Sequence, residues 1–126
     1  MLKDHKVTAT IAVKDLAVAR AFYEQKLGLP VADSADGFYV AFDSAGAPLL
    51  VYRSDYAGGY KATVATWNVT SGLEELVSEL DARGVTFLHY DDMPGTRDGH
   101  VHKNGGMKNA WAQDPDGNIL SFVSEA

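Results

Sequence analysis

Two histidines separated by one residue, His100 and His102, are the side chains in this sequence best suited to chemistry. Alternate residues of an extended segment point to the same side, so both imidazoles would lie on one face and could hold a metal or an anionic ligand. The sequence offers no cysteine and no evident third ligand beside the pair. The alternative is therefore an exposed loop in which both histidines are solvated.

The segment around this pair, residues 94–106, is rich in glycine and lacks apolar periodicity. It also carries Arg97 and Lys103, which are positive charges in an acidic protein. A loop of this length in a small domain is usually functional or disordered. The sequence leaves open a lid that closes over a ligand and a solvated loop. A phosphate-binding loop is excluded, because the Walker spacing is absent and no helix follows.

The other two histidines are His5 and His89. His5 is close to the N-terminus, where chains commonly fray. His89 is near the end of a predicted strand, where a half-buried side chain is expected. Histidine titrates near neutral pH and is the commonest general base, so His89, His100 and His102 are the candidates for that role. The sequence places no second catalytic group beside any of them.

A second notable segment, residues 52–61, combines glycines with Tyr52, Tyr56 and Tyr60. Tyrosine has a flat apolar body and one hydroxyl, which suits both ligand pockets and protein interfaces. Tyr56 and Tyr60 are therefore interpreted either as interface residues or as ligand contacts.

Composition limits the functions that this chain could have. Its 126 residues, 46% hydrophobic and 22% charged, predict one globular domain. The net charge of −6 argues against binding nucleic acid through its backbone. No apolar run is long enough to span a membrane, and no secretory signal is evident. The absence of cysteine excludes disulfides and favours a cytoplasmic protein.

The residues that end strands, begin helices and form turns recur in the two halves of the chain. Residues 13–15 and 69–71 each close an apolar strand and open a helix, and they are 56 residues apart. The turns at 43–46 and 114–117 are 71 residues apart, so the second half carries an insertion, which we place within 91–107. The repeat predicts an α+β fold of two strand–helix–strand–strand–strand modules, about 1–55 and 61–126.

Each predicted helix has start and stop signals. Asp15 is a good N-cap for the first helix, and Gly28 can end it. Ser71 and Glu74 form a capping box at the start of the second helix, which Gly84 ends. The apolar stripes are Leu16, Ala19, Phe22 and Tyr23 in the first helix and Leu73, Leu76, Val77 and Leu80 in the second.

Alternation along the strands predicts which residues face away from the helices. The first strand would place Thr8, Thr10 and Ala12 on that face, with Val7, Ala9, Ile11 and Val13 toward the helix. The fifth strand would place Val64, Thr66 and Asn68 there, with Trp67 on the helix side. The predicted strands are 6–13, 31–32, 37–42, 48–53, 62–69, 86–90, 108–113 and 119–124.

Four short motifs of this sequence occur together in a known group of proteins. The Asp-Pro-Asp-Gly-Asn turn of residues 114–118 precedes an apolar strand, and it accompanies Val-Lys-Asp-Leu at 13–16, Phe-Tyr at 22–23 and Leu-Gly-Leu at 27–29. Together they resemble the vicinal-oxygen-chelate superfamily, which includes glyoxalase I, bleomycin-resistance proteins, fosfomycin-resistance enzymes and extradiol dioxygenases. The resemblance implies two βαβββ modules that form a curved mixed sheet around a cleft, and it implies a homodimer.

Metal enzymes of that superfamily draw ligands from four matching positions. Here the resemblance carries those positions onto Thr8, Leu50 or Val51, Val64 and Ser121. Hydroxyl and aliphatic side chains are poor ligands for a divalent metal, which prefers imidazole, thiolate or carboxylate. The sequence therefore departs from the metal-dependent pattern, and we expect no metal or other cofactor.

The resulting hypothesis is a metal-free protein of the sequestering or resistance type that buries a small apolar or aromatic ligand. Two alternatives remain. The first is an enzyme, either a metal-dependent lyase or dioxygenase with non-standard ligands or one that uses a histidine as general base. The second is a degenerate member of the superfamily whose only role is dimerisation. Polar contacts are expected from Thr8, Thr10, Asn68 and Ser121, stacking from Trp111, Tyr56 and Tyr60, and a lid from the loop of His100 and His102.

Overall fold

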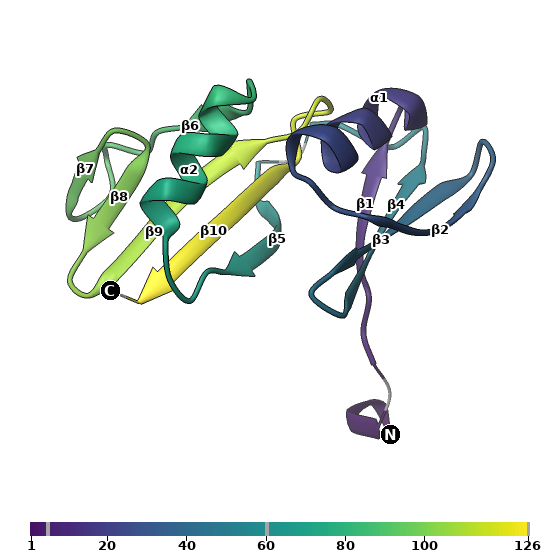
Figure 1. Ribbon diagram of the computed structural model, residues 1–126, viewed down its shortest axis with the longest axis horizontal. Coiled ribbons are helices and arrows are strands. Elements are labelled where there is room, and N and C mark those ends of the chain that lie inside the picture. The colour runs from purple at the N-terminus through teal and green to yellow at the C-terminus, as the bar shows by residue number, and fades with distance from the viewer. Residues whose placement is uncertain (5, 60, 126) are drawn as a thin grey trace. The chain divides into compact units, whose positions relative to one another are not determined.

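The structure is a computed structural model that describes residues 1–4, 6–59 and 61–125. The chain divides into two compact units, Met1–Gly59 and Tyr60–Ala126. Each unit contains one mixed sheet and one main helix (Figure 1), so the predicted α+β class is confirmed. His5 and Tyr60 lie outside the described residues. None of the helices in the described part is long and apolar enough to cross a membrane.

The first unit has a four-stranded sheet in the order β1-β4-β3-β2. Strands β1 and β4 are parallel, and the other pairs are antiparallel. A short 3-10 turn, η1, precedes the sheet. The elements are η1 (Leu2–Asp4), β1 (Ala9–Val13), α1 (Leu16–Ala21), the π-helical turn η2 (Phe22–Lys26), β2 (Val31–Ala35), β3 (Tyr39–Ser44) and β4 (Ala47–Arg53).

The first helix begins and ends where the sequence predicts. The carboxylate of Asp15 accepts a hydrogen bond from the backbone N–H of Val18 at 3.1 Å, as an N-cap does. Gly28 ends the helical segment with a φ of +74°. Its apolar side is buried, with the rings of Tyr23 and Phe42 packed at 5.8 Å between centroids. The predicted stripe of this helix is therefore confirmed, although its last turn is π-helical.

The register of β1 and β4 decides which side chains face the helix. Ile11 is paired with Val51, and both are buried in the core. Thr10 is paired with Leu50, so these two share the opposite face. Of the two candidates for the fourth-strand position, Leu50 is thus the one on the face away from the helix. The strand itself begins at Ala9 rather than residue 6, which leaves Thr8 just before it.

The second unit has strands in the order β5-β10-β9-β8-β7, with β6 also paired to β9. Strands β5 and β10 are parallel, as β1 and β4 are in the first unit. The elements are β5 (Thr63–Asn68), α2 (Leu73–Ala82), β6 (Thr86–Leu88), β7 (Thr96–Asp98), β8 (Val101–Asn104), β9 (Met107–Gln113) and β10 (Ile119–Glu125).

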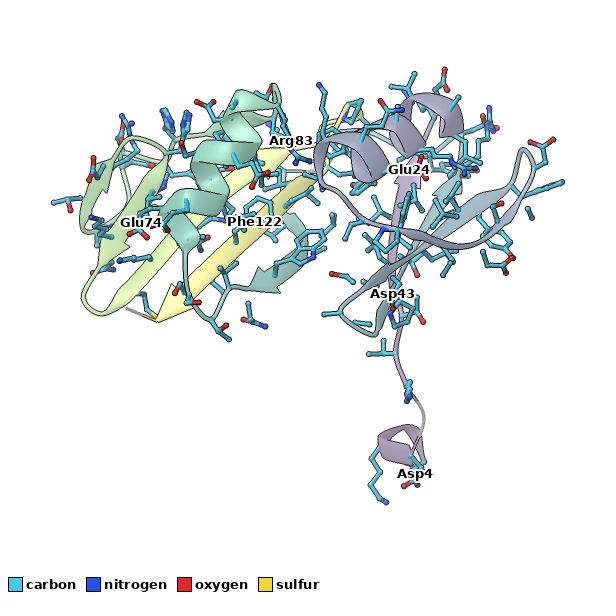
Figure 2. All side chains as sticks on the ribbon, in the orientation of Figure 1. Asp4, Glu24, Asp43, Glu74, Arg83 and Phe122 are labelled. Carbon is cyan, nitrogen blue, oxygen red and sulfur yellow. The ribbon has the colours of Figure 1, made fainter. Side chains whose placement is uncertain are left out.

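The second helix buries the predicted side but lacks the predicted cap. Its N-cap is Gly72, with a φ of +77° and no side-chain hydrogen bond, so the expected capping box is wrong. Glu74 instead forms an ion pair with Lys108 of β9 at 2.6 Å. Figure 2 shows Glu74 on α2 and Phe122 on β10. The side chains of Leu73, Val77 and Leu80 are buried.

Residues 94–106 are not a loop. They form the hairpin of β7 and β8, and β8 extends the sheet along β9 (Figure 1). Backbone pairing holds this hairpin, because Val101 is the one buried side chain among its described residues. A strand that buries so little leaves no apolar alternation in the sequence, which explains why the sequence predicted a loop here instead of a hairpin.

The turn at 114–118 joins β9 and β10 as predicted. Strand pairing is antiparallel and begins with Gln113 opposite Ile119. The carboxylate of Asp114 accepts the backbone N–H groups of Asp116 at 2.9 Å and Asn118 at 2.8 Å. Gly117 has a φ of +85°, which side chains rarely permit.

Candidate functional site

The sheet of the second unit has one face toward α2 and one face away from it. In β9, Ala110 and Ala112 are fully buried on the helix side. Alternation therefore directs Asn109 and Trp111 to the opposite face. Ser121 of β10 is paired with Trp111 and shares that face.

Strand β5 follows the same division. Thr66 is paired with Ser121, so Val64, Thr66 and Asn68 lie on the face away from α2. Trp67 instead stacks on Phe122, with centroids 5.6 Å apart. The predicted placement of Trp67 on the helix side is confirmed.

Aromatic rings meet around Trp111 where β6 leaves the edge of β9. The ring of Tyr90 meets it edge to face, with centroids 5.0 Å apart and planes at 84°. The imidazole of His102 does the same at 4.9 Å and 77°. Such T-shaped pairs are a favourable geometry for aromatic rings. These three side chains are called the Trp111 corner below.

A shallow pocket adjoins the Trp111 corner. Its volume of about 250 Å³ is just below the range of drug-sized ligand sites, so it suits a small ring system. The walls are mainly apolar, and among the lining residues that the structure describes, Lys61 is the one with a charge. This Trp111 pocket is lined by Lys61, Ala62, Thr63, Tyr90, Met93, Trp111 and Ile119.

Larger hollows exist in both units but carry less chemistry. The first unit has one of about 480 Å³ between α1 and the β2–β3 hairpin, where Tyr39 donates to Asp33 at 3.0 Å and Arg20 pairs with Glu24 at 3.7 Å. A hollow of about 320 Å³ is lined in part by Asn68 and Met107. We favour the Trp111 pocket because the rings of Tyr90 and Trp111 both line it, and His102, which has one ring nitrogen without a partner, contacts both rings.

That unused nitrogen belongs to His102. Its Nε2 accepts a hydrogen bond from the backbone N–H of Tyr90 at 2.9 Å, so in the neutral ring the proton is on Nδ1. Nδ1 is buried and has no hydrogen-bond partner. His102 is thus a neutral acceptor in this arrangement, and it ties Tyr90 to β8.

His100 lies in the turn between β7 and β8 and points to a different partner set. Its Nε2 is 3.1 Å from the carboxylate of Asp81 on α2, so Nε2 donates. Its Nδ1 then accepts from Nε2 of His89 at 2.8 Å, and its ring stacks on Phe87 with centroids 4.6 Å apart. The predicted pairing of His100 and His102 on one strand face is therefore wrong, because a turn residue does not follow strand alternation.

His89 was named as a candidate base from the sequence, but its contact with the other two histidines was not predicted. Its ring lies 5.1 Å from that of His100 and 6.3 Å from that of His102, between centroids. His89 is exposed and not half-buried as the sequence predicted. Desolvation by neighbouring atoms is the first cause that lowers its pKa, and the charges of Arg97 and the two neighbouring imidazoles add to this, while Asp91 opposes them. The sequence signal that could have indicated this contact is the position of His89, directly after β6 and beside the predicted insertion.

The positive charges of the hairpin are already paired. Arg97 binds the carboxylate of Asp91 through Nε at 2.7 Å and Nη2 at 3.1 Å, which lowers the pKa of Asp91. Lys103 is 3.6 Å from Asp98. Both cations of the segment are therefore engaged by carboxylates of the segment itself or of the residues just before it.

Ser121 is buried and bonded within its own sheet. Its hydroxyl donates to Oδ1 of Asn109 at 2.9 Å. This leaves its oxygen as an acceptor only, rather than a free donor to a ligand.

Four other predicted contacts are described by the unit to which each belongs. Thr8 and Thr10 are exposed in the first unit, where the hydroxyl of Thr10 donates to the backbone oxygen of Thr8 at 3.2 Å. Tyr56, also in that unit, is 87% exposed. Asn68 borders a different hollow of the second unit.

The residues at the superfamily's metal positions do not fit a metal. Thr8, Leu50, Val64 and Ser121 offer hydroxyls and aliphatic groups where imidazole and carboxylate are needed. Within residues 1–4, 6–59 and 61–125, no three histidine or acidic side chains are grouped so as to hold an ion. The arrangement instead supports stacking and hydrogen bonding at the Trp111 corner.

Comparisons with known proteins agree with this architecture. A family model described as the Glyoxalase/Bleomycin resistance protein/Dioxygenase superfamily matches residues 5–122. A glyoxalase/bleomycin resistance protein/dioxygenase from Alicyclobacillus acidocaldarius has a TM-score of 0.76 at 20% identity, over 97% of this chain and 92% of that chain.

Two further structures have the same fold. Lactoylglutathione lyase from Agrobacterium tumefaciens has a TM-score of 0.72 at 16% identity, over 95% of this chain and 92% of that one. The fosfomycin resistance protein FosX from Listeria monocytogenes has a TM-score of 0.71 at 16% identity, over 97% of this chain and 93% of that chain. No curated protein matches the chain.

Proposed function

The chain belongs to the glyoxalase/bleomycin resistance protein/dioxygenase superfamily, and we propose that it binds a small aromatic ligand in the Trp111 pocket without using a metal ion. The observation that carries this proposal is the perpendicular contact of Tyr90 and Trp111 at the pocket wall. Two rings at right angles offer a flat ligand one face for stacking and one edge for contact.

The charge at the pocket narrows the ligand class. Lys61 lines the pocket, whereas the cations of the neighbouring hairpin are paired with carboxylates. An ammonium beside an apolar wall favours a ligand that carries an acidic group next to its ring. An aromatic carboxylate combines the two features, and its binding would be of the sequestering or resistance type.

Absence of suitable donor groups argues against the metal-dependent lyase or dioxygenase alternative. The four superfamily positions hold no imidazole or carboxylate, so Lewis-acid chemistry there lacks its ligands. Elemental analysis of the purified protein tests this directly. Stoichiometric zinc, nickel, iron or manganese would contradict the metal-free proposal.

One observation favours a histidine-based enzyme as a second candidate. Asp81 accepts from His100, and His100 accepts from His89, which leaves Nδ1 of His89 with a free lone pair. A carboxylate that orients an imidazole chain is a recurring feature of general bases. His89 is not among the described residues that line the Trp111 pocket, however, so this base lies outside the proposed ligand site.

Single-tryptophan variants test the binding proposal, because the chain has two tryptophans on opposite faces of one sheet. In Trp67→Phe, Trp111 is the one fluorophore of that type, and titration with 2-naphthoate should change its emission saturably. In Trp111→Phe, Trp67 reports and should show no saturable change. An equal response from both variants, or from neither, would contradict binding at this pocket.

A further inference from the structure

We propose that His102 is a proton-sensitive latch that holds Tyr90 in place as a wall of the Trp111 pocket, so that acidification weakens ligand binding. The inference concerns regulation and rests on the proposed function of that pocket. It starts from a hydrogen bond in which the imidazole is the acceptor: Nε2 of His102 accepts the backbone N–H of Tyr90 at 2.9 Å.

This behaviour follows from the hydrogen-bonding groups of the imidazole ring in its two protonation states. A protonated imidazole has N–H groups at both ring positions and no acceptor. Protonation would therefore set the Nε2 proton of His102 against the amide proton of Tyr90, and that contact must break. The other ring nitrogen is buried without a partner, so the charged ring gains no hydrogen bond there to offset the loss.

The segment that carries Tyr90 has few other attachments. It runs from the end of β6 to the start of β7, and its residues 91–95 are exposed. The described side-chain hydrogen bonds that tie it to the hairpin join Tyr90 to His102, Arg97 to Asp91 and His89 to His100, and of these the bond of Tyr90 is the one made to β8. Loss of the first leaves the aromatic end of the segment without its anchor to β8.

The position of Tyr90 matters to the pocket, since Tyr90 and Met93 both line it. The backbone N–H of Met93 bonds to the carbonyl of Tyr90 at 3.1 Å, so the two wall residues belong to one turn. A shift of this turn removes the ring that meets Trp111 at 5.0 Å. Release of the latch therefore acts on the pocket directly.

Charged and titratable groups surround the latch from every neighbouring element. Asp91 favours a positive ring at His102, and its bond to Arg97 offsets that attraction. A charged His102 would also repel a charged His89, whose ring lies 6.3 Å away. The full set is Asp81 of α2, His89 and Asp91 before β7, Arg97 and Asp98 of β7, His100 of the turn, and Lys103 of β8.

The first experiment uses the ligand-free protein. Amide exchange and ring-nitrogen shifts are followed by NMR between about pH 7.5 and about pH 5.0, the range in which histidines ordinarily titrate. We expect the protection factor of the Tyr90 amide to fall at least about tenfold as the ring of His102 gains its proton. Unchanged protection after His102 has titrated would overturn the proposal.

Two variants separate the latch from its neighbours. In His102→Gln, the amide oxygen accepts a hydrogen bond but does not titrate, so Tyr90 should stay protected at acidic pH. In His89→Gln, the hydrogen bond of His102 to Tyr90 is kept, so the acid transition should persist. An acid transition in His102→Gln equal to that of the wild type would overturn the proposal. If His102→Gln fails to fold, the exchange of the Tyr90 amide and the ring-nitrogen shifts of His102 in the wild type still test the proposal.

The second experiment adds 2-naphthoate. Its affinity should fall about tenfold between the two pH values in the wild type and stay constant in His102→Gln, a difference of about 1.4 kcal/mol. An equal fall in both proteins would overturn the latch. If the probe does not bind at neutral pH, the proposed function fails, and exchange of the Tyr90 amide still tests the latch by itself.

Discussion

Tyr90 and Trp111 meet edge to face, with their ring centroids 5.0 Å apart, where two strands share one edge of β9. Strand β6 pairs with β9 as far as Leu88 opposite Trp111, and β8 begins its pairing at His102 opposite Asn109. The candidate site thus coincides with a break in strand pairing. At this break, side-chain contacts take the place of strand pairing: the rings of Tyr90 and His102 meet Trp111, and His102 accepts the backbone N–H of Tyr90.

The carboxylate of Asp114 should be a strong determinant of stability. It is 4% exposed and accepts hydrogen bonds from the backbone of Asp116 and from both amides of Asn118. Asp114→Ala leaves these donors unsatisfied, and we expect a loss of about 2 to 4 kcal/mol in the free energy of unfolding. Urea denaturation measures it. Asp114→Asn keeps one acceptor oxygen and should cost less; equal losses would contradict this assignment.

Gly95 should tolerate no side chain. Its φ is +104°, and an added Cβ would collide with the backbone carbonyl of Lys103. We expect Gly95→Ala to cost more than about 2 kcal/mol, because strain and a backbone clash act together. Gly105→Ala is the matched control, with a φ of +61° and open space around the new atom. If thermal unfolding shows both variants equally destabilised, the proposed close approach of Gly95 to β8 is wrong.

The pKa of His89 should make stability depend on pH. Desolvation by neighbouring atoms and then the charge of Arg97 hold this pKa below its ordinary value. The unfolded chain then binds more protons than the folded one between the two values, so stability rises with pH across that window. The free energy of unfolding should be intact above about pH 6.5 and fall below it. Denaturation curves for His89→Gln should show a smaller fall, and identical slopes would contradict the prediction.

Lys61 should distinguish acidic from neutral ligands. If its ammonium attracts a carboxylate, Lys61→Gln should weaken binding of 2-naphthoate severalfold, within the roughly 0.2–1 kcal/mol of an exposed charge pair. Binding of the uncharged 2-naphthamide should not change. The two ligands can be compared by competition against Trp111 fluorescence. Equal losses for both would show that Lys61 contributes packing and not charge.

Local signals predicted much of the fold because they are short-range. Asp15 caps the first helix, Gly28 ends it, and the turn after Gln113 joins β9 to β10. Each feature depends on hydrogen bonds or φ values within a few residues, which the sequence displays directly. Ser71 is the exception, since Gly72 begins the helix and Glu74 pairs with distant Lys108.

The candidate site was less predictable because it depends on pairing between distant residues. The hairpin of β7 and β8 buries little beyond Val101, so its side chains carry no strand pattern. Trp111 was identified as a stacking face, whereas Tyr90 became its partner only through the register of β6 and β9. The sequence singled out His100 and His102 as a pair, but His100 lies in a turn and His102 in a strand, so they bond to different partners.

The central claim is that Trp111 forms the main wall of a pocket for a small aromatic acid, and calorimetric titration with 2-naphthoate tests it most directly. The account predicts saturable one-to-one binding by the wild type and by Trp67→Phe, and a loss of at least about tenfold in Trp111→Ala. Undiminished affinity in a folded Trp111→Ala, or no binding heat in the wild type at several temperatures, would contradict it.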